Sequence, residues 1–364
     1  MTKSMAILLM FVAALLPFLF APRAVETEEP QARAEVRRAR IVVAGDLMQH
    51  DEQLRSALKA DSITYDYEPM FRYVGERFRS ADLAMVNLET TLSARGPYSG
   101  YPAFRSPAAL AQALKDAGVD VAALANNHCC DAGGRGIAST VDILEEAKIM
   151  HTGAFKDSVD YLANNILYLE RCGIRFALLN YTYGTNGIPT PKGRIVNRLD
   201  TVLMARDIAS ISREEVDFIM AFVHWGNEYE RTPNREQRTM AEFLKRHGVE
   251  IVIGSHPHVV QPMELDSLGR VTLFSLGNFV SNQRTRYRDG GLIATIDVEI
   301  VDSVLLNESF SQRKSLNVTL DPVWVHLPDY AVMPREVGDT IPMSADSRRR
   351  YDRFMQDISD HIGI

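Results

Sequence analysis

Six apolar, β-branched runs recur along the chain and are separated by amphipathic stretches. The runs are IVVAG (41–45), LAMVNLE (83–89), VDVAALAN (119–126), VDFIMAFVHW (216–225), VEIVIGSH (249–256) and VTLFSLGNFV (271–280). Each run has the length and composition of a buried strand. Strands that alternate with helical patterns predict an α/β fold built of layers.

Amphipathic segments between these runs predict helices. SPAALAQALKDAG offers Ser106 as an N-terminal cap, Pro107 at the first helical position and Gly118 as the stop. The same distribution of apolar and polar positions occurs in IASTVDILEEAK (137–148) and NREQRTMAEFLKRHG (234–248). Helices are therefore expected on the faces of the predicted sheets.

Composition narrows the class of protein. The chain has 364 residues, of which 46% are hydrophobic and 24% charged, enough for one large or two modest domains. The 40 basic residues against 47 acidic ones give a net charge of -7, which argues against a nucleic-acid partner. The three cysteines, Cys129, Cys130 and Cys172, suit neither a disulfide framework nor a structural zinc site.

The first residues indicate location. An apolar stretch at 5–21 follows Lys3, which predicts that residues 1–24 form either an uncleaved membrane anchor or a cleaved signal peptide. Residues 25–40 are expected to be a linker without a fixed fold. The domain at 41–300 is then expected outside the cytoplasm, with 301–364 as a C-terminal extension that packs on it.

Polar side chains follow each predicted strand at its carboxyl end. They are Asp46, Glu89, Asn126, Asn127, His128, His224, His256, His258 and Asn278. In open α/β sheets this edge is where functional side chains converge. Each residue alone has an ordinary alternative as a helix cap, a turn residue or a core histidine. Their recurrence at successive strand ends favours a common site.

Carboxylate, amide and imidazole groups are suitable ligands for Mn, Fe, Zn or Mg ions, which this pattern does not distinguish. His256-Pro257-His258 is the most specific piece, because residues two apart in an extended segment point to the same side. A pair of divalent ions at this edge would generate a hydrolytic centre. The sequence therefore predicts two divalent metal ions as cofactors.

Seven motifs in order carry a family resemblance. They are GDLM (45–48), NLET (87–90), YPAFRSP (101–107), ANNHCCDAG (125–133), HWGNEY (224–229), GSHPHVVQP (254–262) and SLGNFVSNQ (275–283). Over about residues 41–300 the chain resembles the bacterial capsule-synthesis CapA family, also called PgsA-type poly-γ-glutamate synthesis proteins. That family is similar to calcineurin-like metallophosphoesterases. The resemblance implies a four-layer α/β sandwich of two sheets flanked by helices.

The resemblance also implies roles for particular residues. The expected metal ligands are Asp46, Glu89, Asn127, His224, His256 and His258. From its place after Asn127, His128 is expected to be a general acid oriented by Asp131. Arg105 and Asn278 are expected to contact an anionic substrate. Metallophosphoesterases offer Asp-x-His in the first block, whereas Leu47 and Met48 follow Asp46 here, and the second acid is Glu89 rather than Asp.

Three functional hypotheses remain open at this point. The first is a metal-dependent hydrolase or transferase that acts on an anionic cell-envelope polymer or its precursor. The second is a non-catalytic, membrane-anchored component of the capsule machinery that works with other capsule-synthesis subunits. The third is a nucleotide phosphodiesterase, for which the chain carries no nucleobase-binding signature. Metal content and turnover separate the first two hypotheses.

Overall fold

The computed structural model describes residues 34–304 and 310–364. The segment expected to be a membrane anchor or signal peptide lies outside these residues. Within them, no helix combines the length and apolar character needed to cross a membrane. Val36–Val301 and Arg313–Ile364 form one compact unit, and the architecture below is that of this unit. The remaining described residues, 34–35, 302–304 and 310–312, belong to a second, small unit.

The described helices are α1 (Asp51–Ala57), α2 (Glu68–Phe71), α3 (Gly75–Arg79), α4 (Ala109–Ala117), α5 (Gly133–Glu146), α6 (Ser158–Asn164), α7 (Thr201–Ala209), α8 (Arg235–Arg246), α9 (Arg335–Gly338) and α10 (Ala345–Ile362). The strands are β1 (Ala34–Leu47), β2 (Leu83–Leu88), β3 (Thr91–Ser93), β4 (Arg105–Pro107), β5 (Val121–Ala123), β6 (Met150–Thr152), β7 (Ala154–Phe155), β8 (Leu167–Arg171), β9 (Ile174–Thr182), β10 (Ile195–Val196), β11 (Phe218–His224), β12 (Ile251–Ser255), β13 (Val260–Leu265), β14 (Val271–Leu276), β15 (Asn278–Val280), β16 (Gly290–Val304), β17 (Phe310–Val325) and β18 (Val332–Pro334). Helices lie between β1, β2, β5 and β6 and between β9, β11 and β12, as the apolar runs predict, whereas β12 to β18 follow one another without a helix among the described residues.

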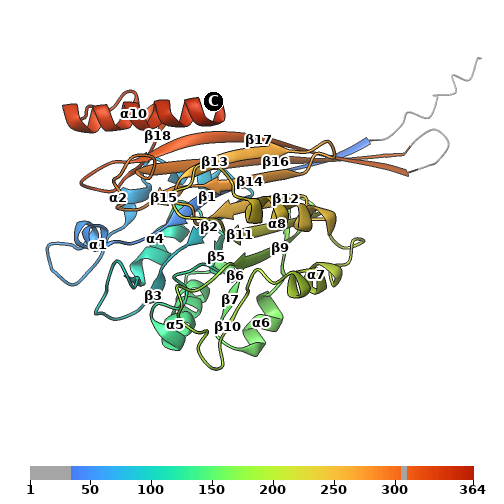
Figure 1. The fold of residues 1–364 in the computed structure, drawn as a ribbon, viewed down its shortest axis with the longest axis horizontal. Coiled ribbons are helices and arrows are strands. Elements are labelled where there is room, and N and C mark those ends of the chain that lie inside the picture. The colour runs from blue at the N-terminus through green and yellow to red at the C-terminus, as the bar shows by residue number, and fades with distance from the viewer. Residues whose placement is uncertain (1–33, 305–309) are drawn as a thin grey trace, which may run out of the picture. The chain divides into compact units, whose positions relative to one another are not determined.

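Two sheets form the centre of the fold (Figure 1). The first has the order β18-β17-β16-β1-β2-β5-β6, with β15 paired to β1, and its neighbours β1, β2, β5 and β6 run parallel. The second has the order β13-β14-β12-β11-β9-β8, in which β14, β12, β11 and β9 are parallel. Each sheet therefore presents the carboxyl ends of several parallel strands at one edge.

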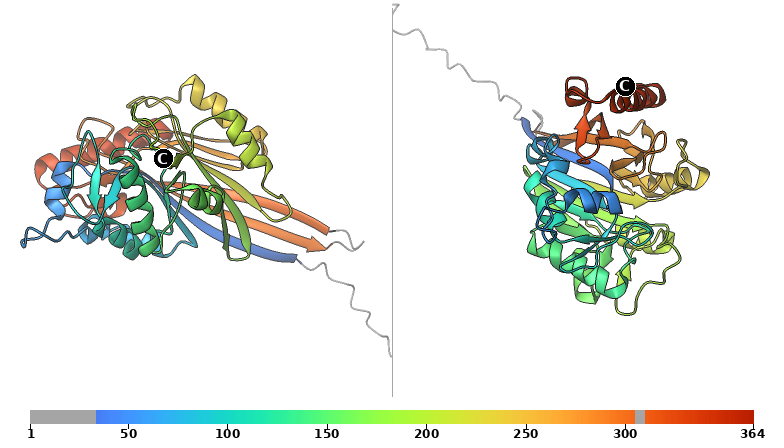
Figure 2. Two further views of the ribbon diagram at one scale, coloured as in Figure 1. Left: turned by 90° about the horizontal axis from the view of Figure 1, so that it is seen from below. Right: turned by 90° about the vertical axis from the view of Figure 1, so that its left-hand side faces the viewer.

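Side chains on alternate positions of β1 belong to different apolar cores. Ile41 and Val43 join the core between the two sheets, whereas Val42 and Ala44 join a core that includes residues of α4 and α5. A third core joins the second sheet to α7 and α8. The result is helices, sheet, sheet and helices, which confirms the predicted four-layer sandwich (Figure 2).

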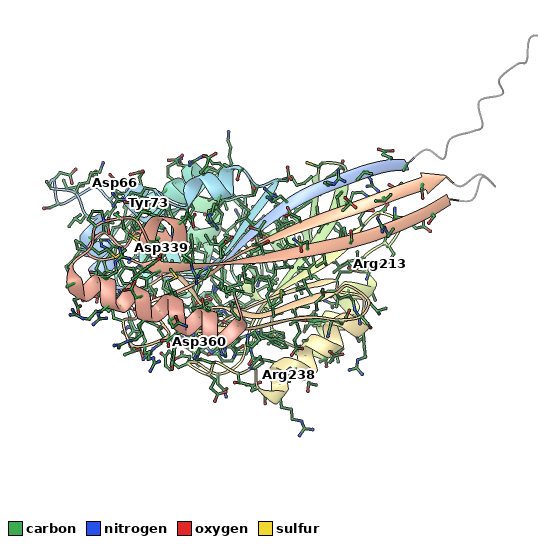
Figure 3. All side chains as sticks on the ribbon, turned by 90° about the horizontal axis from the view of Figure 1, so that it is seen from above. Asp66, Tyr73, Arg213, Arg238, Asp339 and Asp360 are labelled. Carbon is green, nitrogen blue, oxygen red and sulfur yellow. The ribbon has the colours of Figure 1, made fainter. Side chains whose placement is uncertain are left out.

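The C-terminal helix α10 packs on the same unit (Figures 1 and 3). Its buried side chains are Tyr351, Phe354, Met355 and Ile358, a spacing that places them on one helical face. They extend the core between the two sheets, where Tyr351 contacts Trp324 of β17 edge to face. In Figure 3, Asp360 marks the C-terminal end of this helix.

The first strand is longer than the apolar run predicts. The expectation of an unstructured linker up to residue 40 is wrong for its last residues, because β1 already begins at Ala34. Arg38 and Arg40 form ion pairs of 2.7 and 2.8 Å with Glu299 and Asp297 of the neighbouring strand β16. β1 therefore includes charged residues on the N-terminal side of its apolar run.

The start of α4 also differs from the prediction. Ser106 and Pro107 belong to β4 instead of capping the helix, and the Ser106 hydroxyl lies 2.6 Å from that of Thr90. The helix begins at Ala109, and it ends at Gly118 as predicted. Gly118 has φ +104, and a Cβ there would lie 2.6 Å from the Arg79 backbone nitrogen, so both conformation and space favour glycine.

Candidate metal centre

Five parallel strands bring their carboxyl ends to one place. Asp46 lies near the end of β1, Glu89 follows β2 and His224 is the last residue of β11. Asn127 follows β5, and His256 and His258 follow β12. All six side chains are buried. The predicted convergence of strand ends from both sheets is therefore present in the structure.

One donor group consists of Asp46, Glu89 and His258, each of which offers an atom within 4.8 Å of the others. Asp46 Oδ2 lies 3.0 Å from His258 Nδ1, and Glu89 Oε1 lies 3.8 Å from His258 Nε2. His258 Nδ1 is also 3.1 Å from Asn278 Oδ1. Since both neighbours of Nδ1 are acceptors, we infer that Nδ1 carries the proton and that Nε2 keeps its lone pair for a metal.

A second donor group consists of Glu89, His224 and His256. His224 Nε2 lies 2.8 Å from Asn127 Oδ1 and 3.6 Å from Glu89 Oε1, while its Nδ1 lies 2.8 Å from the Ser255 hydroxyl. Glu89 belongs to both donor groups. Its carboxylate would therefore be within reach of a cation held by either group.

Burial shifts the proton affinities of these groups. Burial, reinforced by the charge of Asp46, raises the pKa of Glu89 well above its ordinary value. Burial also lowers the pKa of His224 well below its ordinary value and, with the nearby His258, lowers that of His256 to about 4. The imidazoles are thus neutral at pH 7, the form that binds metals, and the carboxylate lacks a compensating cation.

Two buried atoms at this place have no hydrogen-bond partner among the described residues. They are Glu89 Oε1 and His256 Nδ1, which lie in the same donor group. Buried polar atoms without a partner are uncommon, and an ion is one of the groups that account for them. A divalent cation would satisfy both atoms and offset the buried carboxylates. The residues present therefore fit a metal.

The His-Pro-His segment reaches the site by a different conformation from the one expected. His256 has φ +97 and His258 has φ +57, so both lie in the left-handed region rather than in an extended segment. Both rings nevertheless lie among the ligands, with centroids 5.9 Å apart. Held strain of this kind is typical of functional loops.

His128 lies beside the donor groups without belonging to them. Its Nδ1 is 2.8 Å from Asp131 Oδ2, and the same carboxylate oxygen accepts the Phe104 backbone N–H at 2.7 Å. The Phe104 ring packs edge to face on the imidazole at 4.6 Å. Asp131 and Phe104 therefore hold the orientation of the His128 ring.

The two expected substrate residues have different surroundings. Arg105 donates to the Ser93 hydroxyl and the Arg95 carbonyl, each at 2.9 Å, and it lines a cavity of about 500 Å³ together with Asp131 and Arg135. Asn278 is fully buried and contacts His258. Its contacts suit support of that imidazole, and its role toward a substrate stays a prediction.

Sequence reasoning missed several neighbours of the site. Asn87 donates to Asp46 Oδ1 at 2.8 Å and to Glu89 Oε2 at 3.2 Å, and its position two residues before Glu89 in the chain was a usable signal. Glu228, an exposed residue, forms a third donor group with His256 and His258. The Tyr183 ring lies 4.5 Å from that of His256, with no motif to indicate it.

The family model described as "Bacterial capsule synthesis protein PGA_cap" matches residues 40–283. The chain belongs to this family. The predicted family resemblance is therefore confirmed, and the PGA_cap match contains every predicted ligand.

Two curated proteins illustrate how this PGA_cap chain relates to others. It is 27% identical over 334 residues to "Capsule biosynthesis protein CapA" of Bacillus anthracis, which covers 88% of this chain and 79% of that protein. It is 30% identical over 261 residues to "PGA biosynthesis protein CapA" of Bacillus subtilis, which covers 68% of this chain and 65% of that protein.

Among solved structures, the 5'-nucleotidase of Candida albicans matches with 13% identity and a TM-score of 0.40. The match covers 76% of this chain and 50% of that one. A similarity this low has no bearing on activity.

Proposed function

We propose that this PGA_cap protein is a divalent-metal-dependent hydrolase that cleaves a bond in an anionic cell-envelope polymer or in its phosphorylated precursor. The observation that supports it is the pair of buried donor groups that share Glu89 and leave its Oε1 without a partner among the described residues. The names of the two Bacillus relatives, which refer to capsule and PGA biosynthesis, support the polymer.

The proposed ligands of two ions are Asp46, Glu89, Asn127, His224, His256 and His258. When bound, the ions would supply concentrated positive charge at the scissile group, which favours attack by water. The donor set suits Mn, Fe, Zn or Mg. Asn87 and Asn278, which contact these ligands at 2.8 to 3.2 Å, would hold them in place.

His128 is the proposed general acid. The contact between its Nδ1 and Asp131 keeps one proton on that atom, which leaves Nε2 to exchange a proton with the departing oxygen of the substrate. Asp131 is then a positioning residue. Arg105 lines the cavity that also contains Asp131, so its charge would attract an anionic substrate to the same side of the site.

The same proposal covers location and partners. Residues 1–24 would anchor or export the chain, residues 41–300 would form the catalytic domain outside the cytoplasm, and residues 301–364 would complete its packing. An apolar stretch preceded by Lys3 supports this orientation. A polymer that is made at the membrane and displayed outside would bring other capsule-synthesis subunits to the same place.

Elemental analysis of the purified full chain, combined with a panel of model phosphodiesters and γ-glutamyl oligomers, tests the hydrolase. About two ions per chain together with turnover of one substrate class are expected. One ion or none, together with no turnover on either class after metal is added back, would contradict the proposal.

One observation favours a second candidate, a non-catalytic assembly component. Met48 is buried, with its backbone N–H bonded to Val280, at the place where the resemblance expects a ligand histidine. His50 instead caps α1 and contacts Gln53 at 3.1 Å. One ion would then be held by fewer donors. This candidate predicts an Asp46→Asn chain that still supports capsule export, whereas the hydrolase predicts loss of export.

A further inference from the structure

A cavity of about 250 Å³ is bounded by α10 and by the segment 284–289. Five arginines line it, namely Arg284, Arg286, Arg349, Arg350 and Arg353, against three aspartates. Its formal charge is therefore positive, on a chain whose net charge is -7. One of these aspartates, Asp289, is buried, which raises its pKa, and its Oδ2 accepts the Trp324 Nε1–H at 3.1 Å.

Some of this positive charge has no counterpart among the residues that the structure describes. Arg353 is exposed, with no carboxylate at ion-pair distance in the described part of the chain. Arg284 Nε is buried without a hydrogen-bond partner among the described residues, although its Nη1 donates to the Val325 carbonyl at 2.9 Å. Burying a guanidinium N–H without an acceptor is costly, so Arg284 brings an incompletely compensated cation to the wall of the cavity.

The remaining arginines are paired and show which ligand chemistry suits them. Arg286 forms a fork with Asp357, in which Nε and Nη2 donate to the two carboxylate oxygens at 2.9 and 2.8 Å. Arg349 and Arg350 share Asp346 at 3.2 and 3.3 Å. A planar guanidinium matches a carboxylate in this two-point manner.

The cavity adjoins the metal centre through one short segment. The Arg288 guanidinium lies 3.9 Å from the Tyr229 ring, which in turn is 6.3 Å from the His258 ring. The preceding residue, Tyr287, lines the cavity, and its ring is 4.1 Å from the Arg231 guanidinium. Residues 284–289 thus form a wall of the cavity and also contact the surroundings of His258.

We propose that this cavity is a second subsite, which binds carboxylate groups of a linear polycarboxylate whose scissile bond lies at the metal centre. The proposal rests on the proposed function for the identity of that centre. A chain with regularly repeated carboxylates reaches both places at once, whereas a small anion occupies only one. The subsite therefore selects for a polymer several units long.

Direct binding without metal tests the subsite. A fluorescent γ-linked hexaglutamate is titrated with the full chain in EDTA at low salt. Arg353→Glu is expected to weaken binding about tenfold or more, because it replaces a charge-assisted contact with a repulsion. Arg246→Glu, the same change on the exposed surface of α8, is expected to stay within about twofold of the original chain. Arg353→Gln should weaken binding less than Arg353→Glu.

Two further arms identify the ligand class. Hexaglutamine is expected not to bind, and a phosphodiester oligomer of equal charge is expected to bind more weakly than hexaglutamate. Equal weakening by Arg353→Glu and Arg246→Glu, or tighter binding of the phosphodiester, would overturn the proposal.

A last arm separates this proposal from the hydrolase. The chain with His256→Ala and His258→Ala is expected to keep hexaglutamate binding in EDTA. Binding there without turnover in the original chain would refute the hydrolase and leave the subsite standing. Turnover in the original chain, together with hexaglutamate binding that Arg353→Glu does not change, would refute the subsite and leave the hydrolase standing.

Discussion

His224 Nε2 and Asn127 Oδ1 lie 2.8 Å apart, although the two residues are 97 positions apart and lie at the ends of strands of different sheets. This contact joins the carboxyl end of β11 to the loop after β5. Both atoms can donate electron pairs to a metal. The candidate metal centre therefore lies where the carboxyl ends of strands from the two sheets come together.

Replacing both histidines of the His-Pro-His segment should remove metal while keeping the fold. His256→Ala with His258→Ala deletes one donor from each proposed group, so at least one ion per chain is expected to be lost. Elemental analysis measures this loss, and circular dichroism monitors folding. His247→Ala, an exposed histidine at the end of α8, is the control. Full metal occupancy in the double variant would show that the segment does not bind metal.

Replacing His128 should damage chemistry more than metal binding. His128→Ala is expected to reduce turnover by about 10² to 10⁴ on a substrate with a poor leaving group, because protonation of that group is lost. A substrate whose leaving group has a low pKa should lose much less. Metal content is measured in parallel. If metal occupancy falls in step with turnover, the general-acid role is refuted and His128 supports the ligands instead.

Asp131→Asn tests the positioning role of the carboxylate. The amide still accepts the Phe104 N–H but no longer stabilises a charged imidazole, so turnover should fall while Phe104 keeps its place. Turnover is measured on substrates with a poor and a good leaving group, and the loss should be larger for the poor one. Unchanged turnover on both substrates would remove Asp131 from the mechanism.

Glu89→Gln should have different effects on the stability of the metal-free chain and on the stability gained when metal is added. Burial raises the pKa of Glu89, so the ionised form destabilises the metal-free fold, and a neutral amide removes that cost. The unfolding midpoint in EDTA is expected to stay equal or rise. Metal at 100 times Kd is expected to add about 2.7 kcal/mol to the free energy of unfolding of a chain with an intact site, and this gain should shrink or vanish in the variant. Glu264→Gln, on the partly exposed strand β13, should leave both midpoints unchanged.

The free energy of unfolding should depend on pH through Asp160, which is not one of the proposed metal ligands. Burial alone would raise the pKa of Asp160, but hydrogen bonds from His151, the Lys156 N–H and Asn164 outweigh it, and the pKa is lowered. A lowered pKa in the folded state stabilises the protein above the unfolded value of about 3.9 and stops doing so as the pH falls through the folded value.

Asp160→Asn should therefore cost about 1–3 kcal/mol of unfolding free energy at pH 7, with a smaller difference near pH 3. Urea unfolding at several pH values measures it. Asp352→Asn, at an exposed aspartate of α10, should change the free energy of unfolding little at any pH. A constant difference between pH 7 and pH 3 would contradict the expected linkage.

Location is tested with a reporter fused after Ile364. A reporter that functions only outside the cytoplasm should be active, since the chain has one long apolar stretch, at residues 5–21, and the folded unit follows it. Activity of a reporter that works only inside the cytoplasm would contradict the proposed orientation. Removal of residues 1–24 should then retain the protein in the cytoplasm.

The sequence alone determined the layers of this fold and the composition of the candidate site. Continuous apolar runs of strand length favour central strands, and polar residues at their carboxyl ends, such as Asp46 and His224, indicate the edge of the sheet where a site is built. The tertiary structure decided what depends on distant neighbours. β1 extends beyond its apolar run, where Arg38 and Arg40 pair with Glu299 and Asp297 of β16. Ser106 lies in β4, with its hydroxyl beside that of Thr90.

The packing of distant parts of the chain also decides which residues of the candidate site contact each other. Asn127, His128 and Asp131 are close in the chain, yet Asn127 contacts His224 while His128 contacts Asp131, a division set by the packing of the two sheets. The arginine cavity could not be predicted from the sequence, because Arg284 and Arg353 line one cavity only when α10 packs on the core. Local patterns determine which residues are buried, and only the packed chain determines which of them meet.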